Sequence, residues 1–174
     1  MPQNVRKAIL QALVKLYILL GDSGKEILLY EKYVEAFEND PSCPHILFKL
    51  GNLYREQGAV KLALKRYYDI LQRALTVSQA ELKTYRVMIT KVQIAIAETY
   101  FEMNDLPKAL ELFSKLQLDT LSIENKRKVL FKKIYCQYHL KKYLDALGLL
   151  ENFCDSNIND GYSAETIFLK IKTL

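Results

Sequence analysis

The chain has 174 residues, half of them hydrophobic, so it can bury a core of its own without disulfides or a structural metal. Gly and Pro are sparse while Leu, Ala, Lys, Glu, Ile and Tyr dominate, which favours a mostly helical protein and excludes a β-rich or low-complexity one. The formal net charge of +5 is modest, and three widely separated cysteines (Cys43, Cys136 and Cys154) cannot all pair within one chain. We expect them to be reduced and structural.

The N-terminal region has no feature of a membrane or export segment. The longest strongly apolar stretch, Ile9 to Leu20, is interrupted by Gln11 and Lys15 and is too short to span a bilayer. Residues 1–4 lead directly into an amphipathic helix, without the basic and apolar parts of a signal peptide. By default we expect a cytoplasmic chain with no transmembrane segment. If the sequence is a piece of a longer protein, a periplasmic or outer-membrane-associated location is the alternative.

A first pair of amphipathic helices is predicted between Val5 and Phe37, joined by a turn at residues 21–24. The turn sequence Gly-Asp-Ser-Gly is similar to that around a serine-protease nucleophile, and Gly24-Lys25 is similar to the end of a phosphate loop. The residues that either site needs nearby are missing, so a tight helix-helix turn explains the motif better. Apolar residues mark the facing sides of the two helices: Leu10, Leu13, Val14, Tyr17, Ile27, Tyr30, Val34 and Phe37.

The second pair, from His45 to Leu75, carries the clearest pattern in the chain. Its first helix has an apolar face at the helical spacing i, i+3, i+4, i+7. Gly58 then offers a left-handed helix end, and a second apolar stripe follows. We expect the helices to cross where the small residues Gly51 and Ala63 let the backbones approach, with Leu50, Tyr54 and Tyr67 filling the space around them. The two stripes are Leu47, Leu50, Gly51 and Tyr54, followed by Ala63, Leu64, Tyr67 and Leu71.

This second pair resembles the tetratricopeptide repeat family. The matching residues are Leu47, Leu50-Gly51, Tyr54, Gly58, Ala63 and Tyr67, while Ile70 stands where the family places Ala. The resemblance implies a right-handed superhelix of helical hairpins that binds other proteins, with no catalytic residues.

Two further hairpins are predicted after Ser78. A capping box at Ser78 to Glu81 begins one uninterrupted helix from Gln79 to Met103, followed by a turn at Asn104. The last hairpin, from Lys126 to Asn157, is weaker, because Lys133 and Gln137 stand where the family has Leu and Tyr. Lys133 must therefore snorkel or face a cavity.

Equivalent turns at Gly21, Gly58, Asn104 and Lys141 define a single predicted domain, residues 1–174. It contains repeats at about 5–38, 43–76, 79–118 and 122–157, and a C-terminal capping helix at 163–174. The longer and irregular spacing is similar, more loosely, to bacterial cell-envelope tetratricopeptide proteins of the outer-membrane assembly lipoprotein and periplasmic cell-division coordinator types.

Seven basic residues and no acidic one lie between Asn125 and Leu144. We interpret this basic segment mainly as a solvated helix face, and its alternative is a surface for nucleic acid or another anionic partner. The cations are Lys126, Arg127, Lys128, Lys132, Lys133, Lys141 and Lys142.

The resemblance also places a partner-binding groove on the first helix of each hairpin. Asn52, Lys128 and Lys132 match three positions of the family's carboxylate clamp, but Phe48 and Ala95 replace two others, so this clamp is incomplete. Cys43 and His45 lack further ligands for zinc, and His139 lacks a local carboxylate to orient it as a base. The groove residues implied are Lys15, Phe48, Asn52, Arg55, Lys91, Glu98, Phe101, Lys128, Lys132, Tyr135 and Tyr138.

These observations predict a non-enzymatic scaffold that holds a peptide or helix of a protein partner, in a bacterial envelope assembly if the looser resemblance holds. We expect no catalytic residues, no cofactor and no metal. Nucleic acid is the less favoured partner, and a homo-oligomer formed through the terminal helices is left open.

Overall fold

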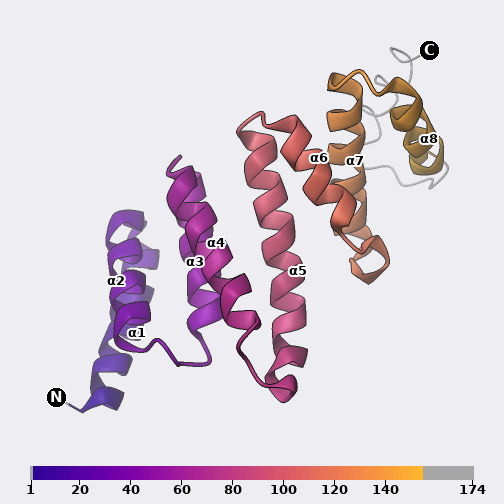
Figure 1. The fold of residues 1–174 in the computed structure, drawn as a ribbon. Helices are drawn as coiled ribbons and strands as arrows, with labels where there is room; N and C mark the ends of the chain where they lie inside the picture. The colour runs from indigo at the N-terminus through magenta and orange to yellow at the C-terminus, as the bar shows by residue number, and fades with distance from the viewer. Residues whose placement is uncertain (1, 155–174) are drawn as a thin grey trace. The chain divides into compact units, whose positions relative to one another are not determined.

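The computed structural model describes residues 2–154, except for the side chains of residues 79–84, 151, 152 and 154. The predicted capping helix at 163–174 lies outside the described residues. Within them the chain is all-α, as predicted, and contains no strand (Figure 1). The helices are α1 (Gln3–Leu20), α2 (Ser23–Ala36), α3 (Cys43–Glu56), α4 (Val60–Ala74), α5 (Gln79–Glu102), α6 (Leu106–Lys115), the 3₁₀ helix η1 (Leu118–Thr120), α7 (Ile123–His139) and α8 (Tyr143–Cys154).

The chain divides into two compact units, and the division falls inside α5, between Val92 and Gln93. In the first unit α1 packs on α2, α2 on α3, and α3 on α4. In the second, α6 packs on α7 and α7 on α8. These five helix pairs are thus formed by neighbours in the chain. The assignment of residues 1–174 to one domain remains a prediction.

The four predicted turn residues share one backbone geometry. Gly21, Gly58, Asn104 and Lys141 have φ angles of 68°, 73°, 60° and 60°, which confirms the predicted turn positions. In each turn the amide after this residue donates a hydrogen bond to the carbonyl five residues earlier, at 2.8 to 3.0 Å. This pattern ends a helix by satisfying a carbonyl that has no partner within the helix.

In the first three turns the next residue is the N-cap, which directly precedes the following helix. The Asp22 side chain accepts a hydrogen bond from the Lys25 amide at 3.0 Å, and that of Asp105 accepts one from the Lys108 amide at 3.2 Å. Ala59 begins α4 without such a cap. The motif at residues 21–24 is therefore a helix-helix turn, as predicted.

In the second hairpin, a large ring lies against the glycine of the facing helix. Tyr67 is fully buried, and its hydroxyl donates to Asn52 Oδ1 at 2.7 Å. A Cβ atom added at Gly51 would lie 2.3 Å from Tyr67 Cε1, closer than any real contact. Small residues were predicted at this crossing, and the structure identifies the Tyr67 ring as the group that occupies the space beside Gly51.

Polar contacts join the helices of the first unit. The Arg66 guanidinium binds Glu31 side-on, with Nη2 to Oε2 at 2.6 Å and Nε to Oε1 at 3.0 Å. Tyr54 also donates to Glu31, at 2.8 Å. Lys7 pairs with the mostly buried Asp40. These contacts join α4 and α3 to α2, and α1 to the loop before α3.

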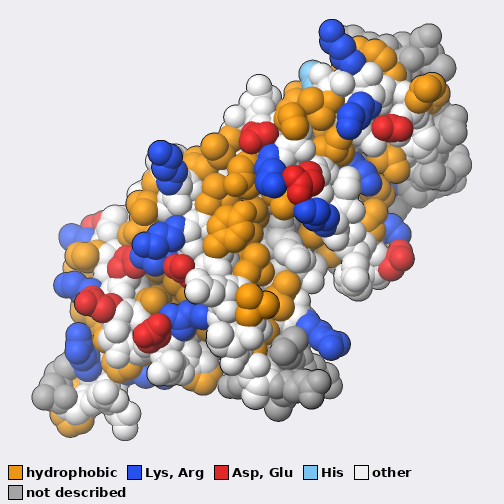
Figure 2. Space-filling model, viewed as in Figure 1, with side chains coloured by type: hydrophobic (Ala, Val, Ile, Leu, Met, Phe, Trp, Pro, Cys, Tyr) orange, Lys and Arg blue, Asp and Glu red, His pale blue; other side chains and the backbone are white. Residues whose placement is uncertain are grey.

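In the second unit, the packed residues form two apolar clusters. One includes Ala97, Ala109, Phe113, Val129 and Cys136, and the other includes Phe131, Ile134, Ala146, Leu150 and Phe153. The buried Arg127 guanidinium lies 4.3 Å from the centre of the Phe153 ring, within cation-π range. Over the face of the molecule in Figure 2, charged side chains of both signs are interspersed with exposed hydrophobic ones.

Candidate partner-binding surfaces

The candidate groove residues of the first unit differ in how deeply their side chains are buried. Lys15 and Lys91 are exposed, whereas Phe48, Asn52 and Arg55 are half-buried. The Phe48 ring lies 5.9 Å from the Tyr67 ring, and Asn52 accepts the Tyr67 hydrogen bond. Phe48 and Asn52 therefore support the hairpin as well as border its surface.

In the second unit, Glu98 binds two of the predicted groove lysines. Its Oε1 atom lies 2.7 Å from Lys128 Nζ and 2.9 Å from Lys132 Nζ, so these contacts connect α5 to α7. Glu98 is only 6% exposed. Burial acts to raise the pKa of this carboxyl, but the hydrogen bonds from the two lysines outweigh it and hold the pKa below its usual value. Glu98 is thus a buried anion that orients both lysines.

Next to this ion pair lies an aromatic row formed by Phe101, Tyr135, His139 and Tyr138. Ring centres are 5.2 Å apart for Phe101 and Tyr135, and 4.2 Å apart for Tyr135 and His139. The distance is 5.3 Å for Tyr138 and His139. Lys132 Nζ lies 5.4 Å from the Phe101 ring centre. The row is partly exposed. It includes His139, which was not among the predicted groove residues although it follows Tyr135 by one helical turn.

The basic segment at residues 126–142 does not act as one surface. Arg127 is buried against Phe153, while Lys128 and Lys132 bind Glu98. Lys126 lies 3.5 Å from Asp119, and Lys141 is the exposed residue with left-handed backbone geometry. The other two, Lys133 and Lys142, line a hollow.

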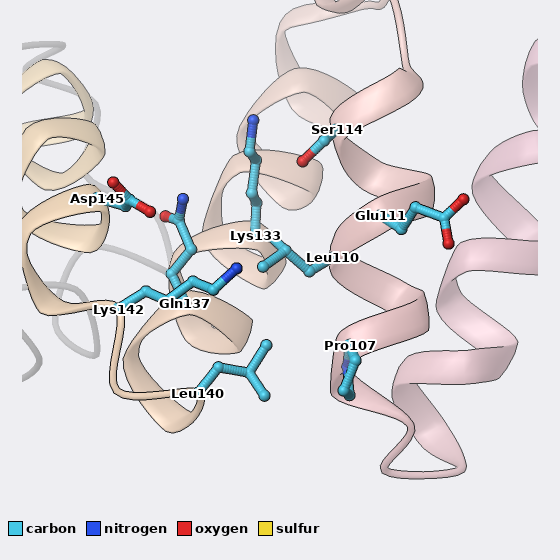
Figure 3. A pocket seen from close by; sticks show the side chains of 9 residues that line it. All are labelled: Pro107, Leu110, Glu111, Ser114, Lys133, Gln137, Leu140, Lys142 and Asp145. Carbon is cyan, nitrogen blue, oxygen red and sulfur yellow. The ribbon is translucent and has the colours of Figure 1, made fainter.

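This hollow, of about 530 Å³, lies between α6, the C-terminal part of α7 and the start of α8 (Figure 3). Gln137 is 8% exposed, and its Oε1 atom has no hydrogen-bond partner among the described residues. The prediction that Lys133 snorkels or faces a cavity is confirmed. The lining residues are Pro107, Leu110, Glu111, Ser114, Lys133, Gln137, Leu140, Lys142 and Asp145.

The α1 helix presents an apolar face to solvent. Val5, Ile9, Leu16 and Leu19 recur at helical spacing and are 46%, 44%, 47% and 85% exposed. This is a terminal surface of the kind invoked for a homo-oligomer, which remains a prediction.

In the described part of the chain, no group of three or more His, Cys, Asp or Glu side chains could hold a metal ion. None of the described helices combines the length and apolar character needed to cross a bilayer. Cys43 and Cys136 are free and buried, and burial raises the pKa of the Cys136 thiol to about 11.

No family model and no curated protein matches the chain. Solved structures do match. A tetratricopeptide repeat protein from Parabacteroides merdae superimposes with a TM-score of 0.74 at 17% identity, over 96% of this chain and 59% of that one. A putative kinesin light chain from Podosopora anserina with nearly identical tetratricopeptide-like repeats gives a TM-score of 0.66 at 17% identity, over 99% of this chain and 86% of that one.

These similarities, with the repeated hairpin geometry, show that the chain has the fold of tetratricopeptide repeat proteins. The predicted fold is therefore confirmed. The chain spans less than two thirds of the length of the Parabacteroides protein. The looser likeness to cell-envelope proteins remains a prediction.

Proposed function

We propose that the protein is a non-enzymatic interaction scaffold that binds a peptide or helix of a partner protein on the first helices of its hairpins. Proteins of this fold stack hairpins and so present extended surfaces for partners. The observation that carries the proposal is the partly exposed aromatic row with lysines beside it. Aromatic side chains such as Tyr and Trp provide much of the affinity in protein interfaces, and the lysines add charge complementarity to an acidic partner.

Within this surface we assign the main contacts to Phe101, Tyr135 and Tyr138. The rings are already held by one another, so binding costs little side-chain entropy. Lys128 and Lys132 keep a fixed position through Glu98 and can offer their remaining N–H groups to acidic groups of the partner. Lys15, Phe48, Asn52, Arg55 and Lys91 are the corresponding candidates in the first unit.

The test uses a partner recovered by pull-down with the full chain. Tyr138→Ala is expected to weaken binding by more than about 1 kcal/mol, measured by calorimetry, while the helical content is unchanged. The matched control is Tyr68→Ala, which removes a 44% exposed tyrosine from the second helix of a hairpin. Equal effects of the two changes would contradict the assignment.

The charge-reversal variants Lys128→Glu and Lys132→Glu are poor probes of binding, because they would place like charges against the buried Glu98. Lys91→Gln is a better probe of charge. If the looser resemblance is right, the recovered partner belongs to a bacterial envelope assembly.

Binding of nucleic acid or another anionic surface through residues 126–142 is the alternative, and it is less well supported. Two of the seven cations bind Glu98 and a third is buried. A filter-binding assay at low and at moderate salt separates the two functions. Retention that falls steeply with salt would favour the alternative, and no retention at low salt would remove it.

A further inference from the structure

The fourth hairpin departs from the other three at three positions, and all three departures line the same hollow. Counted from the turn residue, the side chain eight positions earlier is Leu13, Leu50 or Ile96 in the first three hairpins and Lys133 in the fourth. Four positions earlier, Tyr17, Tyr54 and Tyr100 correspond to Gln137. One position after the turn, Asp22, Ala59 and Asp105 correspond to Lys142.

The replacements at Lys133 and Gln137 remove largely apolar side chains and leave polar groups in their place. The equivalent Leu50 is fully buried, whereas Lys133 and Gln137 border a space of about 530 Å³. That volume is within the range of ligand pockets. The buried Gln137 Oε1 has no partner among the described residues, and a buried acceptor without a partner costs free energy unless something binds to it. The fold is therefore less well packed at this hollow, and the polar groups of Lys133 and Gln137 are available there to bind a ligand.

The charges around the hollow are not balanced. Glu111 lies 2.8 Å from Lys108 and 2.5 Å from Lys115, both on its own helix. In Figure 3 its carboxylate points away from the other labelled side chains. Asp145 then remains as the acid that accompanies the two lysines of the lining. The hollow therefore favours an anionic group.

The remaining lining narrows the choice of ligand. Leu110, Leu140 and Pro107 provide an apolar wall, and the Gln137 oxygen requires an N–H or O–H donor. The phosphodiester groups of nucleic acid carry no such donor, and the lining residues include no aromatic ring on which a base could stack. A peptide has the required groups together: a main-chain N–H, an acidic side chain and an adjacent apolar side chain.

We propose that this hollow is a second binding site, which takes a short acidic segment of a protein. Lys133 and Lys142 pair with an Asp or Glu side chain of the segment. The Gln137 carboxamide accepts a hydrogen bond from a main-chain N–H, and a neighbouring Leu packs on Leu110 and Leu140. None of these residues belongs to the aromatic row, so the site stands independently of the function proposed above.

The probe is the capped pentapeptide acetyl-Ala-Leu-Glu-Leu-Ala-amide, titrated into the ¹⁵N-labelled full chain at low salt. We expect it to shift the side-chain amide resonances of Gln137. The same peptide with Gln in place of Glu should bind about tenfold more weakly, since it lacks the charge. Free glutarate provides the third arm. No shift at Gln137 with the acidic peptide, or glutarate binding as tightly as that peptide, would overturn the proposal.

The decisive variant restores the pattern of the other hairpins. Lys133→Leu combined with Gln137→Tyr refills the hollow, so affinity should fall by about tenfold or more while the melting temperature stays equal or rises. Weaker binding by a variant that is at least as stable as the wild type cannot be caused by unfolding. Unchanged affinity in this variant would contradict the site.

A second variant does not touch the core. Lys142→Gln removes an exposed charge and should weaken binding several-fold, whereas the matched control Lys141→Gln, one residue away and outside the lining, should not. Equal loss in both would mean that net charge alone attracts the peptide. Tyr138→Ala should leave peptide binding intact, which keeps this test separate from that of the aromatic row.

Discussion

The second and fourth hairpins have the same backbone turn but different interiors. Gly58 and Lys141 both have positive φ, and the hydrogen bonds that close the two turns are 2.8 and 2.9 Å long. Inside, the second hairpin places the Tyr67 ring against a glycine, whereas the corresponding positions of the fourth are Ile134 and Leu150, both fully buried. The turn thus determines how the chain reverses. The space between the two helices can be filled either by a large ring facing a glycine or by two side chains of medium size.

The third hairpin follows the same rule. Its corresponding residues are Ala97 and Phe113, again a small side chain and a large ring, both almost fully buried. A large residue on the second helix is thus matched by a small one on the first. Packing at near-crystalline density requires such compensation, since neither a void nor an overlap is tolerated.

The largest expected effect tests this compensation directly. Gly51→Ala should destabilise the protein by about 3 kcal/mol, because the new methyl group overlaps the Tyr67 ring, which is fully buried and hydrogen-bonded. Urea unfolding measures the loss. Gly24→Ala is the control, since its Cβ would meet only Asp22 Oδ1, at 3.6 Å.

A double change tests whether positions 51 and 67 share the same space. Gly51→Ala with Tyr67→Leu gives the second hairpin a larger residue on its first helix and a smaller one on its second, as Ile134 and Leu150 do in the fourth. The double variant should be more stable than the sum of the single effects predicts, by about 1 kcal/mol or more. Strict additivity would show that the two positions do not share their space.

Glu98→Gln is expected to have the next largest effect, a loss of about 2 kcal/mol near neutral pH, because the change removes the buried negative charge that pairs with Lys128 and Lys132. The folded-state pKa of Glu98 is depressed, so its stabilising contribution is present above its ordinary pKa of 4.5 and is lost as the pH falls through the lower folded value. Thermal melts between about pH 6 and about pH 3 should show a smaller loss in the variant than in the wild type. An identical pH dependence would contradict this role.

A smaller effect is expected at the helix starts. Asp105→Ala removes the side-chain cap of α6 and should cost about 1 kcal/mol. Conversely, Ala59→Asp should stabilise the second hairpin by a similar amount, since Ala59 has backbone angles of −80° and 58°, close to the −82° and 69° of Asp105. Chemical denaturation of both variants checks the pair, and a loss on Ala59→Asp would show that α4 begins differently.

The smallest effect concerns the fourth turn. Lys141→Gly should stabilise the chain by about 0.5 kcal/mol, because relief of the left-handed strain is partly offset by the greater freedom of glycine in the unfolded state. Lys141→Ala keeps the strain and is the control. No gain with glycine would mean that lysine tolerates this conformation here at no cost.

Much of the fold could be predicted from the sequence because its determinants are local. Gly58 and Asn104 favour left-handed helix ends by their own chemistry, and the repeat spacing identified Lys141, whose residue type alone would not. The long helix α5 followed from the absence of Gly and Pro after Ser78. The residues expected around Gly51 included Tyr67, but that the Tyr67 ring itself lies against Gly51 depended on how α3 and α4 cross, which propensity does not give.

The candidate surfaces were less predictable. Helical register could place Phe101, Tyr135 and Tyr138 on first helices. It could not show that Lys132 binds Glu98, 34 residues earlier, because this contact depends on the packing of α5 against α7. The hollow was indicated by Lys133 and Gln137, two polar residues at apolar positions. That Lys142 also lines the hollow could not be predicted, because its position depends on the conformation of the turn at Lys141.

The pairing of helices with their neighbours in the chain has a consequence for how the protein acquires its structure. The main helix pairs are formed by consecutive segments, so little loop entropy is lost before each of them forms. The contacts of Arg66 with Glu31 and of Lys132 with Glu98, which join residues 35 and 34 positions apart, can form afterwards. Folding should therefore begin in any hairpin and spread to the next, with relaxation on the order of microseconds to milliseconds. Substitutions in one hairpin should then change the order of these events more readily than they prevent them.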